Sequence, residues 1–305
     1  MDSDEVTFSG GEARGEELFA SLFDDAALFP PGNAPMAAAV PAHRRHRASW
    51  YAGFVGPFIC ADTRLAELPA DLAISVVVTG GPAAIEGLVE GLAEGLAEGL
   101  GTLPNAVALE VSGVADPADA AAAVTALRAW MSGNRASGNR ASGPDRGAAG
   151  FVEVPRGEAS LPVLDVLAGT AFLAKFRTGG LQAQAFPSEA ELAGAIVACA
   201  DRGLPFKCTA GLHHAVRHTA PDTGFEHHGF LNVLLATSAA LDGVAADEVA
   251  GVLAERDAAA VADRIRALGD DEVAAARRMF RSFGTCSIDE PLDDLAALGL
   301  ITVPA

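Results

Sequence analysis

The chain has 305 residues, with 21 lysines and arginines against 40 aspartates and glutamates, and its formal net charge at pH 7 is −19. Such a negative field repels nucleic acid and anionic membranes, so we exclude both as expected partners and expect a small-molecule substrate instead. Half of the residues are hydrophobic, which is typical of a globular chain and not of a disordered one.

The cysteines and the first residues indicate the compartment. Four cysteines are widely spaced and form no Cys-x-x-Cys pair, which argues against a disulfide framework and against a cysteine-ligated zinc site. The amino-terminal stretch is acidic and lacks the apolar centre of a signal peptide, and no run of residues is apolar for long enough to span a membrane. We therefore expect a cytoplasmic protein. Its oligomeric state stays open, and a homo-oligomer is compatible with the sequence.

Eight short apolar runs predict eight β-strands. They cover residues 22–29, 54–61, 73–79, 107–111, 150–154, 171–177, 205–209 and 279–286. Their hydrophobicity is continuous and does not alternate, which is typical of strands that are buried on both faces of a parallel sheet. Stretches rich in Ala, Leu and Glu predict helices between them, over residues 82–100, 117–131, 188–202 and 246–268.

Eight strand–helix units in a chain of this length predict an α/β fold, a (β/α)8 TIM-type barrel with parallel strands. A doubly wound open sheet is the alternative. We favour the barrel because polar residues recur at the ends of several successive strands, and a barrel brings all these ends to one face, whereas an open sheet concentrates chemistry at one switch point.

Residues 1–305 are predicted to form a single barrel domain with two additions. Residues 132–149 repeat Ser, Gly, Asn and Arg and are expected to be a flexible low-complexity insertion. Residues 213–278 form an extended, mostly helical connection between the seventh and eighth strands. The sequence leaves open whether the first third supplies the first strands of the barrel or a separate cap.

The chain contains two lysines, Lys175 and Lys207, while arginines carry the remaining positive charge. Arginine stays protonated, whereas a desolvated lysine can lose its proton and attack a carbonyl carbon. The two lysines fall on the predicted sixth and seventh strands, which are neighbours. Mutual repulsion and desolvation are expected to lower the pKa of at least one of them towards neutrality. The alternative is that they are ion-pair partners of buried carboxylates.

Further candidates lie near the same strand ends. Glu110 and Glu153 can transfer protons or hold the second lysine charged, unless they only form ion pairs that fill the barrel. Glycines after the two lysine strands can expose backbone N–H groups to an anion. The predicted substrate-binding residues are Arg177, Thr178, Gly179, Gly180, Thr209, Gly211, His214 and Asp25.

Short motifs over the last third of the chain resemble a known enzyme group. The runs Lys175-Phe-Arg-Thr-Gly and Phe206-Lys207-Cys-Thr-Ala-Gly, with the tail Phe283-Gly-Thr-Cys-Ser, are similar to the class I, Schiff-base deoxyribose-phosphate aldolases. The resemblance implies an aldolase- or lyase-type reaction without a cofactor. Lys175 would form the imine, Lys207 would be its electrostatic partner, and Glu110 would stand in for the catalytic aspartate of the family.

The histidines support a rival reading. Five of the seven lie between His213 and His228. His214 and His218 share one face if their segment is helical, and His227 or His228, with Glu226 or Asp222, would complete a zinc, manganese or iron site for a metal-dependent hydrolase or lyase.

The sequence also supports predictions for three other histidines and one cysteine. His213 can also act as an acid or base on the substrate. His43 and His46 are interpreted as a solvated helix face, and Cys208 as a small buried hydrophobe that points away from its lysine neighbour. A second alternative function is a non-catalytic barrel that binds an anionic metabolite.

Overall fold

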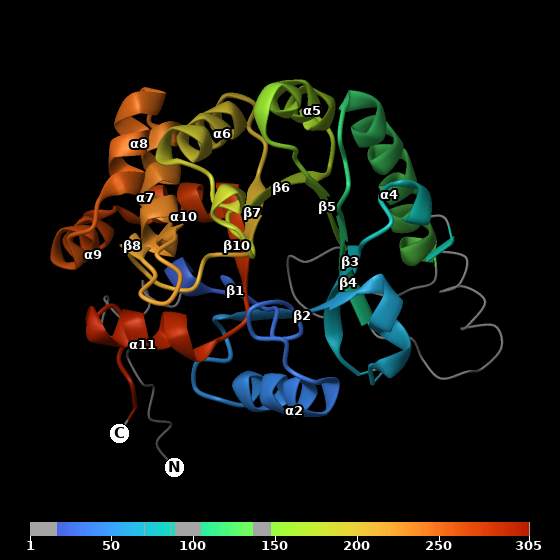
Figure 1. Cartoon of the computed structure of the whole chain (residues 1–305), viewed down its shortest axis with the longest axis horizontal. Helices are drawn as coiled ribbons and strands as arrows, with labels where there is room; N and C mark the ends of the chain where they lie inside the picture. The colour runs from blue at the N-terminus through green and yellow to red at the C-terminus, as the bar shows by residue number, and fades with distance from the viewer. Residues whose placement is uncertain (1–16, 70, 86, 89–104, 137–147, 305) are drawn as a thin grey trace, which may run out of the picture.

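The computed structural model describes residues 17–69, 71–85, 87–88, 105–136 and 148–304, and its centre is a closed barrel of eight parallel strands (Figure 1). The strands are β1 (Phe23–Asp25), β2 (Val55–Ala61), β3 (Ala73–Val78), β4 (Asn105–Val111), β5 (Ala149–Glu153), β6 (Leu173–Arg177), β7 (Phe206–Thr209) and β10 (Phe280–Thr285). They follow one another around the barrel in this order, and β10 closes it on β1 through the pairs Phe23 with Phe283 and Asp25 with Thr285.

The predicted TIM-type barrel is therefore confirmed, and the open sheet is wrong. Each of the eight predicted strands overlaps one of the observed strands. The first third of the chain supplies β1 to β4, so these residues belong to the barrel wall and do not form a separate cap.

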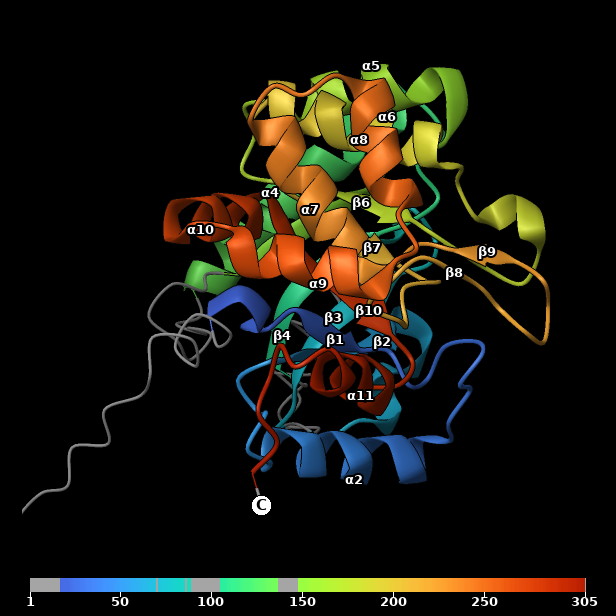
Figure 2. The same ribbon diagram turned by 90° about the vertical axis from the view of Figure 1, so that its left-hand side faces the viewer.

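Helices surround the barrel on its outside (Figures 1 and 2). They are α2 (Met36–Arg47), α4 (Pro117–Ala136), α5 (Ser160–Leu167), α6 (Glu189–Asp201), α7 (Phe230–Leu241), α8 (Ala246–Ala254), α9 (Ala258–Ala267), α10 (Asp270–Met279) and α11 (Asp289–Ala297). Helix α6 begins with a capping box, in which Ser188 and Glu191 each bind the other's backbone N–H group. The helix was expected over residues 188–202 and is observed there.

Three of the expected segments differ from the structure or lie partly outside the described residues. The single helix expected over residues 246–268 is two helices, because Asp257 accepts hydrogen bonds from the backbone N–H groups of Ala259 and Ala260 and so starts α9 anew. Most of the helix expected over 82–100 falls outside the described residues, and so do residues 137–147 of the expected insertion, whose first residues complete α4.

The connection between β7 and β10 is long and largely helical, as expected. It contains a two-stranded antiparallel hairpin, β8 (His218–Thr219) and β9 (Glu226–His227), followed by α7 to α10. Helix α7 is buried on nearly all sides, since the barrel lies on one side of it and α8 and α9 cover the other (Figure 2). None of the described helices is long and apolar enough to cross a membrane.

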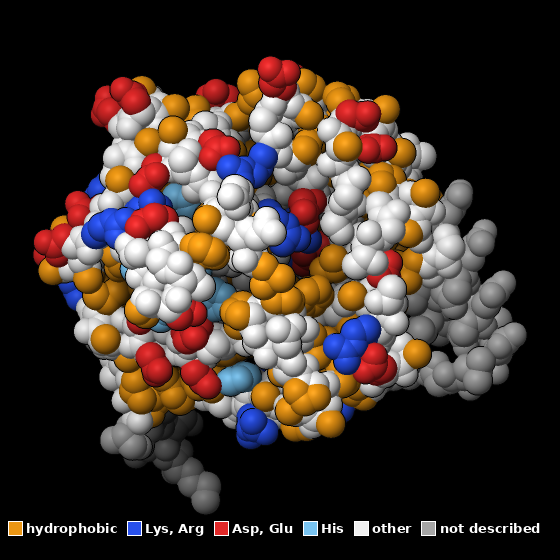
Figure 3. Space-filling view, in the orientation of Figure 1, with side chains coloured by type: hydrophobic (Ala, Val, Ile, Leu, Met, Phe, Trp, Pro, Cys, Tyr) orange, Lys and Arg blue, Asp and Glu red, His pale blue; other side chains and the backbone are white. Residues whose placement is uncertain are grey.

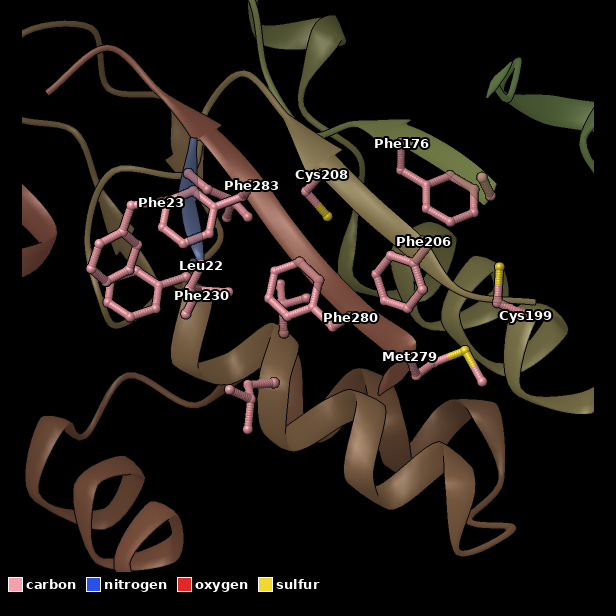
Figure 4. Close-up of a cluster of buried hydrophobic side chains, with 14 of the residues drawn as sticks. Leu22, Phe23, Phe176, Cys199, Phe206, Cys208, Phe230, Met279, Phe280 and Phe283 are labelled. Carbon is pink, nitrogen blue, oxygen red and sulfur yellow. The ribbon is translucent and has the colours of Figure 1, made fainter. Parts of the chain in front are cut away.

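The outer faces of the last strands pack against α7 through aromatic rings (Figure 4). The ring centroids of Phe230 and Phe283 are 5.1 Å apart, and those of Phe23 and Phe230 are 5.7 Å apart. Cys208 lies fully buried in this cluster, and burial raises the pKa of its thiol. The expectation that Cys208 is a small buried hydrophobe, turned away from Lys207, is confirmed.

This packing predicts different costs for two leucine truncations. Leu234 in α7 is fully buried, whereas Leu161 in α5 is 52% exposed. We expect Leu234→Ala to lower the free energy of unfolding by about 2–5 kcal/mol, because it leaves a cavity. Leu161→Ala should cost about 1 kcal/mol or less. Urea titration followed by circular dichroism measures both. Equal losses would contradict the packing of α7 against the barrel.

Candidate active site

A cavity of about 570 Å³ opens where the carboxyl ends of the strands meet. Lys175, Arg177 and Thr209 contribute to its lining from β6 and β7, and loops around them supply further residues. Figure 3 shows histidine, acidic and basic side chains together on the face that Figure 1 presents. This end of a TIM-type barrel is the one that carries active sites.

Below the cavity, the barrel interior holds a buried charge network of three carboxylates and two lysines. Lys207 Nζ donates to Asp24 Oδ2 and to Glu110 Oε1, both at 2.6 Å. Lys175 Nζ lies 3.0 Å from Glu110 Oε2 and 3.2 Å from Glu153 Oε2. Glu110 therefore stands between the two lysines and faces each with one of its oxygens.

The strand register explains how these side chains come together. Glu153 is paired with Lys175, and Lys175 with Lys207, across three neighbouring strands, so the three side chains lie at one level of the barrel. Two hydroxyl groups complete the network. Ser75 donates to Glu110 Oε1 at 2.6 Å, and Ser282 donates to Asp24 Oδ2 at 2.6 Å. Seven of the eight strands thus contribute a polar side chain to it.

The pKa values follow from this arrangement. Burial alone would lower the pKa of Lys207, but Asp24 and Glu110 outweigh burial and raise it. Burial would raise the pKa of Glu110, but Lys207 and Lys175 outweigh burial and lower it. The pKa of Asp24 is raised, because burial exceeds the effect of Lys207. Repulsion and desolvation, which were expected to lower the pKa of at least one lysine, do not lower that of Lys207, since carboxylates contact its ammonium group.

The two lysines differ in what they can reach. Lys175 lines the large cavity, whereas Lys207 lines a second cavity of about 380 Å³ near the amino ends of the strands, together with Asp24 and Ser282. The oxygens that face Lys175, Glu110 Oε2 and Glu153 Oε2, accept no hydrogen bond from any described residue. Lys175 is thus held by charge, and Lys207 by charge and hydrogen bonds together.

Arg177 extends the charged groups into the cavity. Its Nε lies 3.3 Å from Glu153 Oε1, and its side chain is about half exposed. Glu153 therefore connects a buried amine to a guanidinium that solvent and ligands can reach. A carboxylate or phosphate on a ligand would find Arg177 available for a bidentate contact.

The glycines and Thr178 mainly join two loops. The Thr178 hydroxyl is buried and donates to Ala210 O at 2.5 Å. Gly211 has φ +80°, and a Cβ on it would lie 2.6 Å from Thr178 O, so no larger residue fits there. Gly179 packs against Gly211 in the same way. Thr178 and Gly179 are not among the cavity-lining residues, whereas Gly180 and Gly211 are.

Asp25 is also placed outside the cavity lining. Its Oδ2 lies 3.0 Å from Nδ1 of His43 on α2, and its Oδ1 accepts a hydrogen bond from the backbone of Ala27. His43 is 3% exposed, so the expectation of a solvated position is wrong for this histidine. The pair fastens α2 to the end of β1 and gives Asp25 a structural partner.

His213 also lines the cavity. Its Nδ1 lies 2.8 Å from Glu290 Oε2 and 3.4 Å from the hydroxyl of Thr285. Burial would lower the pKa of His213, but contacts with Cys286 and Glu290 outweigh burial and raise it to about 9. His213 is therefore positively charged near neutral pH and can donate a proton into the cavity.

The remaining histidines have different surroundings. His214, His218 and His227 line the cavity, and the ring of His218 lies 4.7 Å from that of His214 and 5.1 Å from that of His227. His214 Nδ1 also contacts Asp294 Oδ2 at 3.1 Å, and the pKa values of His218 and His227 are lowered mainly by burial. His228 is buried elsewhere, with its Nε2 2.9 Å from Pro187 O. Within the described part of the chain, no group of three or more His, Cys, Asp or Glu side chains is arranged to hold a metal ion.

The other two proposed ligands also have separate surroundings. Glu226 forms ion pairs with Arg217 and Arg256, and its carboxylate accepts a hydrogen bond from Thr219. Asp222 lines the cavity. Glu226 therefore serves mainly to hold the β8–β9 hairpin in place.

Several residues of the site were not predicted as such. Asp24, Ser75 and Ser282 belong to the buried charge network, and Cys286 and Glu290 line the cavity. Asp24, Ser75 and Ser282 could have been found in the sequence, because each is a polar residue inside an apolar strand. Cys286 and Glu290 could not have been found in this way, because only the loop geometry brings them to His213.

Comparisons of the chain with protein-family models, with curated proteins and with solved structures give no match. The activity must therefore be inferred from the buried charge network and the cavity above it.

The network predicts a large cost for losing one cation. We expect Lys207→Met to lower the free energy of unfolding by about 3–5 kcal/mol, because Asp24 would lose its buried cation and Glu110 would keep only Lys175. Arg44→Met is the control, since the exposed pair of Arg44 with Asp71 should contribute about 1 kcal/mol or less. Chemical denaturation measures both variants. A loss of similar size in the two would contradict the network.

His213 predicts a pH-dependent contribution to stability. The pKa of His213 is about 9 in the folded protein, above the usual value of about 6.5 in an unfolded chain. The charged imidazole therefore stabilises the folded state fully below pH about 6.5, and this stabilisation is lost as the pH rises through about 9. We expect His213→Gln to lower the urea midpoint more at about pH 6 than at about pH 10. NMR titration should find His228 shifted the opposite way, to a pKa of about 4. An ordinary pKa for His213 would contradict its pairing with Glu290.

Proposed function

We propose that this barrel is an enzyme that acts on a small, anionic carbonyl compound through an imine on Lys175, in an aldolase- or lyase-type reaction. One observation carries the proposal: of the two lysines, Lys175 is the one that lines the cavity, and its Nζ lies between the carboxylates of Glu110 and Glu153. An amine at a cavity surface with a carboxylate at ion-pair distance has a nucleophile and a proton acceptor side by side.

Imine formation needs the neutral amine. Glu153 is the better proton acceptor, because its side chain is 17% exposed, whereas Glu110 is fully buried and has its pKa lowered mainly by Lys207 and Lys175 against the effect of burial. The ammonium of Lys175 passes a proton to Glu153, and the free electron pair attacks the carbonyl carbon. The carbonyl oxygen takes up a proton, and loss of water leaves an iminium.

The iminium then accepts electrons from a neighbouring bond. A base removes the proton of the substrate hydroxyl, the adjacent C–C bond breaks, and its electron pair moves to the imine nitrogen to form an enamine and a free aldehyde. His213, which is charged near neutral pH, is the acid that returns a proton to the enamine carbon. Water then releases the second product and regenerates the amine of Lys175.

Lys207 and Arg177 have supporting roles in this scheme. Lys207 keeps Glu110 ionised, and thereby acts on Lys175 through the shared carboxylate and not by direct repulsion. Arg177 and the backbone of Gly180 face the cavity and would hold an anionic group of the substrate. The strongly acidic chain needs such a local positive patch to bind an anion.

The proposal is tested by trapping the imine. Wild type, Lys175→Arg and Lys207→Arg would be incubated with glycolaldehyde, dihydroxyacetone, pyruvate and sugar phosphates, reduced with borohydride and analysed by intact and peptide mass. We expect an adduct at position 175 in wild type and Lys207→Arg, and none in Lys175→Arg. An adduct at Lys207 would reverse the roles. Binding of these anions without any adduct would favour a non-catalytic barrel.

The proton acceptor is tested separately. We expect Glu153→Gln to slow adduct formation about 100-fold, because the amide cannot take the proton of the ammonium. Glu158→Gln is the matched control, since Glu158 is exposed in the loop that follows β5. An unchanged rate in Glu153→Gln, with folding intact by circular dichroism, would rule out Glu153 as the acceptor.

A further inference from the structure

Cys286 stands apart from the other cysteines of the chain. It follows β10 directly and lines the large cavity, whereas Cys60, Cys199 and Cys208 are fully buried in the core. Burial raises the thiol pKa of Cys60 to about 11 and that of Cys199 to about 12, so both resist ionisation. A ligand in the cavity therefore meets one thiol, and that thiol belongs to the same cavity as Lys175.

The surroundings of Cys286 resemble those of an activated thiol. Its Sγ lies 3.8 Å from His213 Nδ1 and 4.0 Å from His213 Nε2. The same imidazole contacts Glu290 Oε2 at 2.8 Å. The carboxylate keeps the imidazole charged, which places a positive charge beside the sulfur. The carboxylate and the thiol both approach Nδ1 of His213, so thiol, imidazole and carboxylate are neighbours in the cavity wall.

Three separate segments hold this series in place. His213 lies in the loop after β7, Cys286 in the loop after β10, and Glu290 in the first turn of α11. Gly32, from the loop after β1, packs so closely that a Cβ on it would lie 2.9 Å from the Cβ of Cys286. The cysteine is therefore enclosed on the side of the β1 loop, and its accessible side belongs to the cavity.

We propose that Cys286, activated by His213 and Glu290, is a second nucleophile of the cavity that adds reversibly to the carbonyl carbon of a small aldehyde. A sulfur lone pair forms the S–C bond, the π electrons of the C=O bond move to oxygen, and the proton that the thiol loses passes through solvent to this oxygen. The product is a hemithioacetal, and nothing is oxidised or reduced. Only the choice of an aldehyde as ligand rests on the proposed function.

In a lyase reaction this addition has a use. Cleavage of the substrate leaves an enamine on Lys175 and a free aldehyde in the same cavity. Capture by Cys286 would retain the aldehyde while the enamine is protonated, and reversal of the addition would release it. The thiol of Cys286 thereby holds the aldehyde fragment, while the amine of Lys175 holds the enamine fragment.

The activation is tested by timed alkylation with iodoacetamide at about pH 7, with peptide mass analysis of all four cysteines. We expect Cys286 to react first, and His213→Gln and Glu290→Gln each to slow its modification about tenfold, because the thiolate loses its charged neighbour. His214→Gln is the matched control, since His214 lies in the same loop but pairs with Asp294. Equal rates in His213→Gln and His214→Gln would overturn the activation.

The capture is tested by protection. Glycolaldehyde should slow alkylation of Cys286 in a saturable way, both in wild type and in Lys175→Arg, while ethylene glycol, which lacks the carbonyl, should not. Lys175→Met serves as a second variant if Lys175→Arg does not fold. Failure to protect, or equal protection by ethylene glycol, would overturn the proposal.

The two proposals fail in different ways. Protection that disappears in both Lys175 variants would mean that an adduct on Lys175 merely covers Cys286, which leaves the imine standing and overturns capture by the thiol. Protection without any reducible adduct on Lys175 would support the thiol and contradict the imine.

Discussion

The carboxylate of Glu110 is the group on which the interior of this barrel depends. It is fully buried, and it contacts a lysine with each of its oxygens. An unpaired charge at this depth would be very unfavourable, so Glu110 requires both lysines, and each lysine in turn requires a carboxylate. Asp24 and Glu153 supply the remaining negative charges. The charged side chains inside the barrel therefore depend on one another.

This requirement gives the two lysines different surroundings, although they are partners in the strand register. Lys207 is fixed by short hydrogen bonds to Asp24 and Glu110 and stays charged. Lys175 has only charge contacts and borders the cavity. Of the two lysines, Lys175 is therefore the one that a ligand in the large cavity would meet.

In the cavity wall, as in the barrel interior, a carboxylate holds a cation beside another reactive group. Glu290 fixes the charge of His213, and His213 faces Cys286. An amine and a thiol therefore border one space, Lys175 beside Glu153 and Cys286 beside His213. The histidines of the β8–β9 hairpin have a different character, because the pKa values of His218 and His227 are lowered mainly by burial, and these rings stay neutral near pH 7.

The sequence by itself determined the strands, their parallel arrangement and the choice of the two lysines as central residues. These features depend on local hydrophobic runs and on residue type, and both can be read along the chain. Only the tertiary structure decided which charges meet. Asp24 and Lys207 are 183 residues apart, and they pair because β10 closes the barrel on β1 and brings the first strand near the seventh. The burial of His43 and the approach of Cys286 to His213 have the same origin. Strand register and barrel closure set these contacts, and the local pattern of hydrophobic residues does not predict them.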